Sequence, residues 1–318
     1  MKSHESMRGW SLIWWLFTLF GIPVTFPWLL YHIYDILKRR RRLSTLRGKV
    51  VMITGASSGL GEALAHVFYS SGCRLILVAR RKNELERVKN TLMHTHHTVP
   101  THPPVVLSVD LTEVNNLPKE IDKLIQIHGK IDVLINNAGI SYRGEASSTE
   151  MDVDIKVMLI NYFAQIALAK AILPSMIKRR SGHIVCISSV QGKIAIPYRS
   201  AYGASKHALG AWCDSARAEL AGSNIKIMVI NPGYIKTDLS LNALTGSGDK
   251  YGVMDKTIQE GYSPEYVAKQ VLSALLRDSS EVTVAPLLPR LAQFIRYVSP
   301  ALYFFIMERR AKKLAKGE

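Results

Sequence analysis

Short apolar runs alternate with helical patterns from Lys49 onward, and this alternation constrains the fold more than any other feature of the chain. The apolar runs are nearly uninterrupted, which is typical of strands whose sheet is covered by helices on both faces. A strand, a helix and a further strand form the repeating unit of parallel sheets. We therefore predict an α/β fold with a doubly wound parallel sheet of seven strands, at residues 49–54, 73–79, 104–110, 131–136, 182–188, 224–231 and 281–285.

Helical patterns fill several intervals between these strands. We predict helices at about residues 59–71 and 83–94, two helices after the fourth strand of which the second covers about 161–179, and a helix that contains Tyr202. A long polar loop with several glycines follows the sixth strand, at residues 240–257. A loop of this length in a compact domain is more often a cover over a substrate site than a simple connection.

The length of 318 residues gives room for one large α/β domain with extensions. We divide the chain into an N-terminal membrane-anchor segment with a basic flank (1–47), a central domain (48–285) and an apolar, basic C-terminal extension (286–318). The apolar and aromatic part of that extension is interrupted by Arg290 and Arg296. This pattern suits an interfacial helix or a flap that faces lipid.

The N-terminal apolar segment covers residues 10–34, which contain no Asp, Glu, Lys or Arg. About 20 residues cross the hydrocarbon core of a bilayer as a helix, so this segment is long enough to span it. It is longer than the apolar core of a signal peptide. Its Trp and Tyr residues lie mostly near the two ends, as interfacial anchors do. Pro23 and Pro27 count against a straight helix, which leaves a re-entrant or interfacial segment as the alternative. In either form we expect a membrane anchor.

The formal net charge of +16 comes largely from two basic runs, at residues 38–49 and 308–318. A nucleic-acid site would need stacking aromatics or a recognition helix among the basic residues, and neither run has them. Both runs adjoin apolar stretches, which points to anionic lipid headgroups. We therefore predict a membrane as partner and no nucleic acid.

The same charges predict an orientation. Only Lys2 and Arg8 precede the apolar segment, whereas seven basic residues follow it between Lys38 and Lys49. Basic residues beside a span favour the cytoplasmic side. We therefore expect a single-pass protein of the endoplasmic reticulum membrane, with the peroxisomal membrane as the alternative and the central domain in the cytosol.

Neither the cysteines nor the histidines indicate a metal site. Cys73, Cys186 and Cys213 are far apart in apolar surroundings, without the spacing of a disulfide framework or a zinc site. Five histidines fall in a charged helix end, a loop and beside Lys206: His94, His96, His97, His102 and His207. No carboxylate or cysteine is spaced with them, so we expect solvated side chains and no metal.

The stretch "TGASSGLG", residues 54–61, lies where the first strand becomes a helix. Gly55, Gly59 and Gly61 permit a tight turn and a close approach of the backbone to a pyrophosphate at the helix N-terminus. A plain glycine turn is the alternative. The position between a strand and a helix favours a dinucleotide.

The end of the second strand indicates which dinucleotide binds. An Asp or Glu near this point would bind the ribose 2′-hydroxyl of NAD. This chain has Ala79 followed by Arg80 and Arg81, and guanidinium groups favour a 2′-phosphate. We predict NADP(H) rather than NAD(H). The alternative is that the two arginines only begin an exposed helix.

Tyr202 and Lys206 are four residues apart, so a helix places them on the same face. Alone, this pattern is more often an ordinary surface helix. Beside a dinucleotide, an adjacent ammonium would lower the pKa of the phenol, which is otherwise about 10.

Five motifs occur together in this order: "TGASSGLG", "NNAG" (136–139), "ISS" (187–189), "YGASK" (202–206) and "NPGYIKTD" (231–238). Their order and spacing over residues 48–285 resemble the short-chain dehydrogenase/reductase family. The flanking segments resemble a membrane-associated branch of it. The resemblance implies a Rossmann-type fold and an enzyme, an NADP(H)-dependent oxidoreductase.

The resemblance also implies roles for single residues. Tyr202 is the expected acid/base, and Lys206 tunes it and holds the nicotinamide ribose. Ser189 would hydrogen-bond the substrate oxygen, and Asn161 matches the fourth catalytic position. The expected cofactor-binding residues are Gly55, Ser57, Ser58, Gly59, Leu60, Gly61, Arg80, Arg81, Asp110, Leu111, Asn137, Ala138, Gly139, Tyr202, Lys206, Pro232, Gly233, Ile235 and Thr237.

A membrane anchor beside such a site predicts a hydrophobic, lipid-type ketone or secondary alcohol as substrate. Steroids, retinoids, long-chain ketones and acyl-dihydroxyacetone phosphate all fit. Two other functions stay open: an NAD-dependent alcohol dehydrogenase of the same fold, and a non-catalytic NADP(H)-binding membrane protein that acts through partners. The intact set of catalytic residues argues against the last. Homo-oligomerisation is left open.

Overall fold

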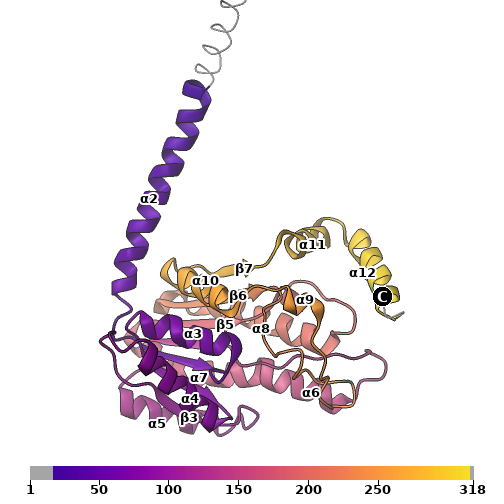
Figure 1. Cartoon of the computed structure of the whole chain (residues 1–318), viewed down its shortest axis with the longest axis horizontal. Helices are drawn as coiled ribbons and strands as arrows, with labels where there is room; N and C mark the ends of the chain where they lie inside the picture. Colours follow the sequence, from indigo (N-terminus) through magenta and orange to yellow (C-terminus); the bar gives the residue numbers. More distant parts are fainter. Residues whose placement is uncertain (1–16, 316–318) are drawn as a thin grey trace, which may run out of the picture. The chain divides into compact units, whose positions relative to one another are not determined.

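The computed structural model describes residues 17–315. The chain divides into two compact units between Thr45 and Leu46. In the larger unit, seven parallel strands form one sheet in the order β3-β2-β1-β4-β5-β6-β7 (Figure 1). The strands are β1 (Val50–Thr54), β2 (Arg74–Ala79), β3 (Val105–Ser108), β4 (Val133–Asn136), β5 (Gly182–Ile187), β6 (Ile225–Pro232) and β7 (Glu281–Val284). The predicted doubly wound parallel sheet is confirmed.

Helices cover both faces of the sheet. They are α3 (Gly59–Ser70), α4 (Lys82–Thr95), α5 (Leu117–His128), α6 (Met151–Met158), α7 (Ala164–Arg179), α8 (Ser200–Glu219) and α10 (Pro264–Leu276). Leu64 of α3, Leu85 of α4 and Val271 of α10 belong to one core cluster. Helices α5, α7 and α8 supply the other core, which explains why β1 and β4 are buried at every residue.

The topology creates a crevice where the order of strands reverses. The chain moves outward from β1 to β2 and β3, then returns to β4 on the other side of β1. Loops that leave neighbouring strands in opposite directions separate at this point, and ligands of open α/β sheets bind there. The loop after β1, residues 55–58, lies at this crevice.

Helices α6 and α7 are joined by a π-helical turn, η2 (Leu159–Phe163), into one path of 29 residues. Among the residues that the structure describes, only this stretch has the length and hydropathy of a membrane span. Half of its most apolar 18-residue part is buried within the domain, and Leu168 and Ile172 belong to the core. It is therefore a core helix of the α/β domain.

The N-terminal unit contains η1 (Phe17–Gly21) and α2 (Ile22–Ser44). Residues 10–16 of the predicted anchor lie outside the described residues. Pro23 is in the first turn of α2, where its missing N–H costs little, and Pro27 is inside the helix. Large apolar side chains of α2, Phe26 and Trp28 among them, are exposed.

The C-terminal extension forms two helices, α11 (Leu287–Val298) and α12 (Pro300–Ala315), where the sequence predicted a single interrupted segment. The break falls at Ser299 because Pro300 lacks an N–H and disfavours helical conformation in the residue before it. The remaining short helices are η3 (Val190–Gly192), η4 (Ala221–Ser223) and α9 (Lys256–Gln259). All three cysteines are buried and free, as expected.

Candidate active site

A cavity of about 860 Å³ opens at the carboxyl ends of the strands. Its wall contains the residues that directly follow β1, β2, β4, β5 and β6, among them Gly55, Arg80, Asn137, Ser188 and Gly233. Every residue expected to contact the cofactor lines this cavity, and so does Ser189. Asn161 does not line it. The sheet therefore gathers on one cavity residues that are up to about 180 positions apart in the chain.

The glycine-rich loop forms one end of the cavity. Gly55 and Gly59 have φ angles of +65° and +58°, a conformation that favours glycine. A Cβ on Gly61 would lie 2.0 Å from the Gly55 carbonyl oxygen. The loop thus turns tightly into the N-terminus of α3, which directs free backbone N–H groups toward a negatively charged ligand.

The "NNAG" segment after β4 is fastened to this loop. Thr54 Oγ1 accepts hydrogen bonds from the backbone N–H groups of Asn137 and Ala138, each at 3.0 Å. Asn137 Nδ2 donates to the Thr54 carbonyl oxygen at 2.9 Å. These contacts fix the crevice between β1 and β4.

The two arginines after β2 have different environments. Arg81 Nη2 donates to the hydroxyl groups of Ser57 and Ser58, each at 3.0 Å. Arg80 forms a long ion pair of 3.9 Å with Asp110, and its side chain is 64% exposed. The sequence predicted both arginines as cofactor-binding residues, and Arg81 is the one whose guanidinium reaches the glycine-rich loop.

Helix α8 carries Tyr202 and Lys206 on its buried face. Ala201, Ser205, Leu209 and Cys213 follow one another at intervals of four and are buried, so the helix is held against the sheet. This packing turns the first two turns of the helix toward the cavity, which Tyr202 and Lys206 both line.

Ser189, Tyr202 and Lys206 meet at the end of β5. Ser189 lies close enough to the Tyr202 hydroxyl to lower its pKa, and Ser189 Oγ accepts from the Gln191 backbone N–H at 3.1 Å. Lys206 Nζ donates to the Ile187 carbonyl oxygen at 2.9 Å and lies 5.7 Å from the centre of the Tyr202 ring.

The pKa of Tyr202 differs from the sequence expectation. Burial raises its pKa above the ordinary value, and this effect exceeds the lowering by the Ser189 hydrogen bond and by the charges of Arg143 and Arg199. Burial also lowers the pKa of Lys206 to about 8. Lys206 is turned toward a backbone carbonyl, so the guanidinium groups are the cations that act on the phenol here.

Asn161 lies on the π-helical turn between α6 and α7 and is fully buried. Its Oδ1 accepts from the Ile140 N–H at 2.8 Å, and its Nδ2 donates to the Ile140 carbonyl at 2.9 Å and to Ser205 Oγ at 3.0 Å. It therefore joins the segment after β4 to helix α8. π-Helical turns are often found at functional sites.

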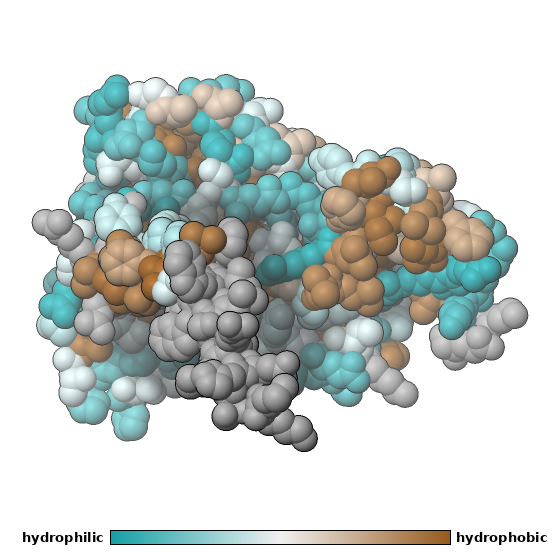
Figure 2. All heavy atoms as spheres, turned by 90° about the horizontal axis from the view of Figure 1, so that it is seen from above, coloured by the Kyte–Doolittle hydropathy of each residue, from teal (hydrophilic) through white to brown (hydrophobic). Residues whose placement is uncertain are grey.

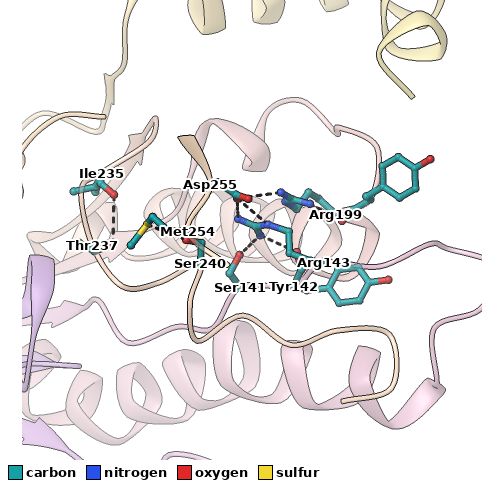
Figure 3. Close-up of polar contacts among 10 residues, drawn as sticks. Ser141, Tyr142, Arg143, Arg199, Ile235, Thr237, Ser240, Met254 and Asp255 are labelled. Atoms are coloured by element: carbon teal, nitrogen blue, oxygen red, sulfur yellow. Dashed lines mark hydrogen bonds and ion pairs between the residues drawn. The ribbon is translucent and has the colours of Figure 1, made fainter. Parts of the chain in front are cut away.

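A group of charged residues near the site received no role from the sequence. Arg143, in the segment after β4, lines the cavity and forms an ion pair with Asp255 of the loop after β6 (Figure 3). Arg199, directly before α8, contacts the same carboxylate. Arg143 and Asp255 are 112 residues apart in the chain, so no local pattern in the sequence indicated their contact.

The far end of the cavity is formed by the loop after β6 and by the C-terminal helices. The predicted cover, residues 240–257, contributes Asn242 and Thr257, and its neighbours Leu239 and Ile258 also line the cavity. Helices α11 and α12 add Leu288, Pro289, Ala292, Met307 and Arg310. This end is mostly apolar, unlike the glycine-rich end.

Comparison with known proteins agrees with this geometry. Residues 49–246 match the family described as short chain dehydrogenase. The chain is 53% identical over 314 residues to "Dehydrogenase/reductase SDR family protein 7-like" of Anopheles gambiae, covering 99% of both chains. It is 48% identical to "Dehydrogenase/reductase SDR family member 7B" of Xenopus laevis, covering 92% of this chain and 93% of that one. The chain belongs to the short-chain dehydrogenase/reductase family, and the predicted resemblance to one branch of it is confirmed as similarity to proteins named member 7B and protein 7-like.

Solved structures agree on the fold. A metagenomic short-chain oxidoreductase described in complex with NADP is 28% identical, with a TM-score of 0.62 over 76% of this chain and 99% of that one. A short-chain dehydrogenase/reductase from Burkholderia phymatum described in complex with NAD is 20% identical, with a TM-score of 0.70 over 81% of this chain and 95% of that one. The family identifies the protein as an oxidoreductase with a nicotinamide cofactor.

Proposed function

We propose that the protein is a membrane-bound, NADP(H)-dependent reductase of hydrophobic ketones. The observation that carries this proposal is that the glycine-rich loop, Ser189, Tyr202 and Lys206 border one cavity whose other end is apolar. A protein that only bound the cofactor would not need a phenol and a serine hydroxyl side by side on the wall of the same cavity.

The residues at the glycine-rich end fit an NADP(H) molecule. Free N–H groups at the start of α3 suit a pyrophosphate. The end of β2 has Ala79, where an Asp or Glu would bind the ribose 2′-hydroxyl of NAD. Arg81, with the hydroxyls of Ser57 and Ser58, offers a cluster of donors for a 2′-phosphate.

The roles of the side chains follow from their contacts. Bound NADPH supplies the hydride. The Tyr202 hydroxyl donates a proton to the substrate oxygen, and Ser189 hydrogen-bonds that oxygen as negative charge develops on it. Lys206 lines the cavity and would hold the nicotinamide ribose of the cofactor. Asn161 keeps the segment after β4 in register with α8.

The proposed substrate is a lipid-type carbonyl compound. The wall formed by α11, α12 and the loop after β6 is largely apolar, and large apolar side chains of α11 and α12 are exposed next to it. Figure 2 shows this surface as a brown patch on the right. A substrate delivered from a bilayer would enter along such a surface.

A screen of lipid carbonyls tests the proposal. Purified protein is mixed with NADPH and with steroid, retinoid, long-chain and acyl-dihydroxyacetone-phosphate ketones, and loss of NADPH absorbance is followed. We expect turnover with at least one hydrophobic ketone and little with short polar ones. Turnover confined to small hydrophilic carbonyls would contradict the substrate class.

Cofactor preference depends on Arg81. We expect NADPH to bind at least about tenfold more tightly than NADH, as charge-assisted contacts are worth about 1.5–3 kcal/mol. Arg81→Ala should remove most of this preference. Arg80→Ala serves as the matched neighbour and should remove less, because Arg80 is paired at long range with Asp110 whereas Arg81 contacts the hydroxyls of Ser57 and Ser58. Equal affinity of the unmutated protein for both cofactors, measured by fluorescence titration, would disprove the NADP(H) assignment and favour the NAD-dependent alternative.

We propose that helices α11 and α12 bind an anionic bilayer surface, because their exposed apolar residues adjoin Arg309, Arg310, Lys312 and Lys313. The fragment 46–318, which forms a compact unit, should sediment with vesicles that contain anionic phospholipid. Phe294→Asp combined with Tyr297→Asp should lower binding by about tenfold or more. Ile127→Asp on α5, where the side chain is 71% exposed, is the control and should bind like the parent. Unchanged binding of the double variant would refute this surface.

The basic residues after the N-terminal apolar segment support a cytosolic catalytic domain in the endoplasmic reticulum or peroxisomal membrane. Added protease should therefore degrade the domain in sealed microsomes. Family relatives with N-terminal anchors include enzymes that face the lumen. A domain that survives until detergent is added would reverse the orientation.

A further inference from the structure

Asp255 contacts Arg143, in the segment after β4, and Arg199, directly before α8 (Figure 3). It belongs to the loop between β6 and α10. Its Oδ2 accepts from Arg143 Nη2 at 2.7 Å and from Arg143 Nε at 3.1 Å, a fork of two bonds to one oxygen. Arg199 Nη2 donates to the same oxygen at 3.4 Å.

These groups are removed from solvent. The side chains of Arg143, Arg199 and Asp255 are 7%, 16% and 18% exposed. Arg143 also donates to Ser141 Oγ and to the Tyr142 carbonyl, and Arg199 donates to the Tyr198 carbonyl. Breaking a buried ion pair by removing one partner is costly, because the remaining charge stays buried without compensation.

The balance of charge is positive. Burial and the neighbouring charge of Arg143 lower the pKa of Arg199 to about 10, which leaves Arg199 protonated at neutral pH. Two guanidinium groups contact one carboxylate. The other titratable groups near Arg199 are Tyr234 and Tyr251.

The position of the cluster gives it two effects. The loop that contains Asp255 also contributes Leu239 and Asn242 to the cavity wall. Arg199 precedes Tyr202 by three residues at the start of α8, and its carbonyl accepts from the Gly203 N–H at 2.8 Å. The cluster thus touches both the cover of the cavity and the helix that carries the proposed acid.

We propose that Asp255 is a positioning residue that fastens the loop after β6 over the reaction site by bridging Arg143 and Arg199, and that the excess positive charge of this cluster faces the Tyr202 hydroxyl. The catalytic consequence rests on the proposed function, whereas the fastening of the loop does not. Besides burial, Ser189, Arg143, Tyr234 and Arg199 act on the pKa of Tyr202, and Lys206 Nζ lies 5.7 Å from the centre of its ring. Arg143 and Arg199 lower its pKa and Tyr234 raises it, so the arginines partly offset the effect of burial.

Hydrogen exchange tests the fastening without any substrate. The full-length protein in detergent, saturated with NADPH, is compared with Asp255→Asn, Asp255→Glu and Asp249→Asn. Asp249 is the matched control, because it is an exposed acid of the same loop that bonds only within that loop. Amides of residues 239–254 should exchange at least about tenfold faster in Asp255→Asn, with partial rescue in Asp255→Glu and no change in Asp249→Asn. Equal exchange in Asp255→Asn and Asp249→Asn would overturn the proposal.

The pH dependence of oxidation tests the charge. The reactive form in this direction is the phenolate, so kcat/KM for the alcohol product of the screen rises with pH toward the pKa of Tyr202. Arg199→Gln removes a cation, raises that pKa and should move the midpoint up by about half a pH unit or more, whereas Arg199→Lys should keep it. An unshifted midpoint in Arg199→Gln would refute the effect of the charge. Absence of turnover in the unmutated protein would instead refute the proposed function, and hydrogen exchange would still decide on the loop.

Discussion

Tyr202→Phe is expected to abolish turnover while the protein still binds NADPH. The substitution removes the hydroxyl that donates the proton and changes the volume of the side chain little. General acid catalysis contributes about 10²- to 10⁴-fold, so the residual rate should be about a hundredth or less. The ring remains beside Lys206, and the glycine-rich loop is untouched, so the affinity for NADPH should change little.

Tyr69→Phe is the matched control for this experiment. Tyr69 belongs to α3, is buried in a core cluster and does not line the cavity. Its variant should keep nearly full activity. If Tyr202→Phe retains more than about a tenth of the activity, the assigned acid/base role is wrong.

Gly61→Ala should be the most damaging substitution in the cofactor-binding end. An added Cβ would lie 2.0 Å from the Gly55 carbonyl oxygen and 2.8 Å from Asn137 Nδ2, so the backbone of the loop must move. Overpacking of this kind costs about 1–3 kcal/mol or more. We expect a lower melting temperature by several degrees, and NADPH affinity reduced by more than about tenfold.

Gly210→Ala separates the effect of the clash from that of alanine itself. Gly210 lies in α8, and a Cβ built on it meets no described atom within 4 Å apart from its chain neighbours and the nearby backbone of its own helix. Alanine is favoured over glycine inside a helix by about 0.5–1 kcal/mol, so this variant should be as stable as the parent or more stable. If Gly61→Ala resembles Gly210→Ala in both stability and NADPH binding, the close approach at Gly61 is not required.

The parallel sheet was predictable because burial on both faces demands uninterrupted apolar strands, and such strands stand out in the sequence. Helices α5 and α10 were missed although local signals exist for both. Ser263 caps α10 by accepting from the Tyr266 N–H, and Pro264 occupies its first turn. Helix α5 likewise has proline in its first turn and ends at Gly129, which is left-handed. These are ordinary signals of helix ends.

The site was predictable in its location more than in its contacts. Spacing placed Arg80 and Arg81 at the end of β2, but adjacent residues point in different directions, so only the structure shows that Arg81 reaches Ser57. The contact between Arg143 and Asp255 joins positions 112 residues apart, which no local pattern records. The pKa of Tyr202 depends on burial, and burial arises from the packing of the whole fold.

Transfer of a labelled hydride tests the central claim most directly. NADPH that carries two deuterium atoms at C4 of the nicotinamide is incubated with the full-length protein and the best ketone of the screen, and the product is analysed by mass spectrometry. We predict an alcohol that gains one deuterium on the former carbonyl carbon, formed by the unmutated protein and not by Tyr202→Phe. An unlabelled alcohol, or equal labelling by Tyr202→Phe, would contradict hydride transfer at this site.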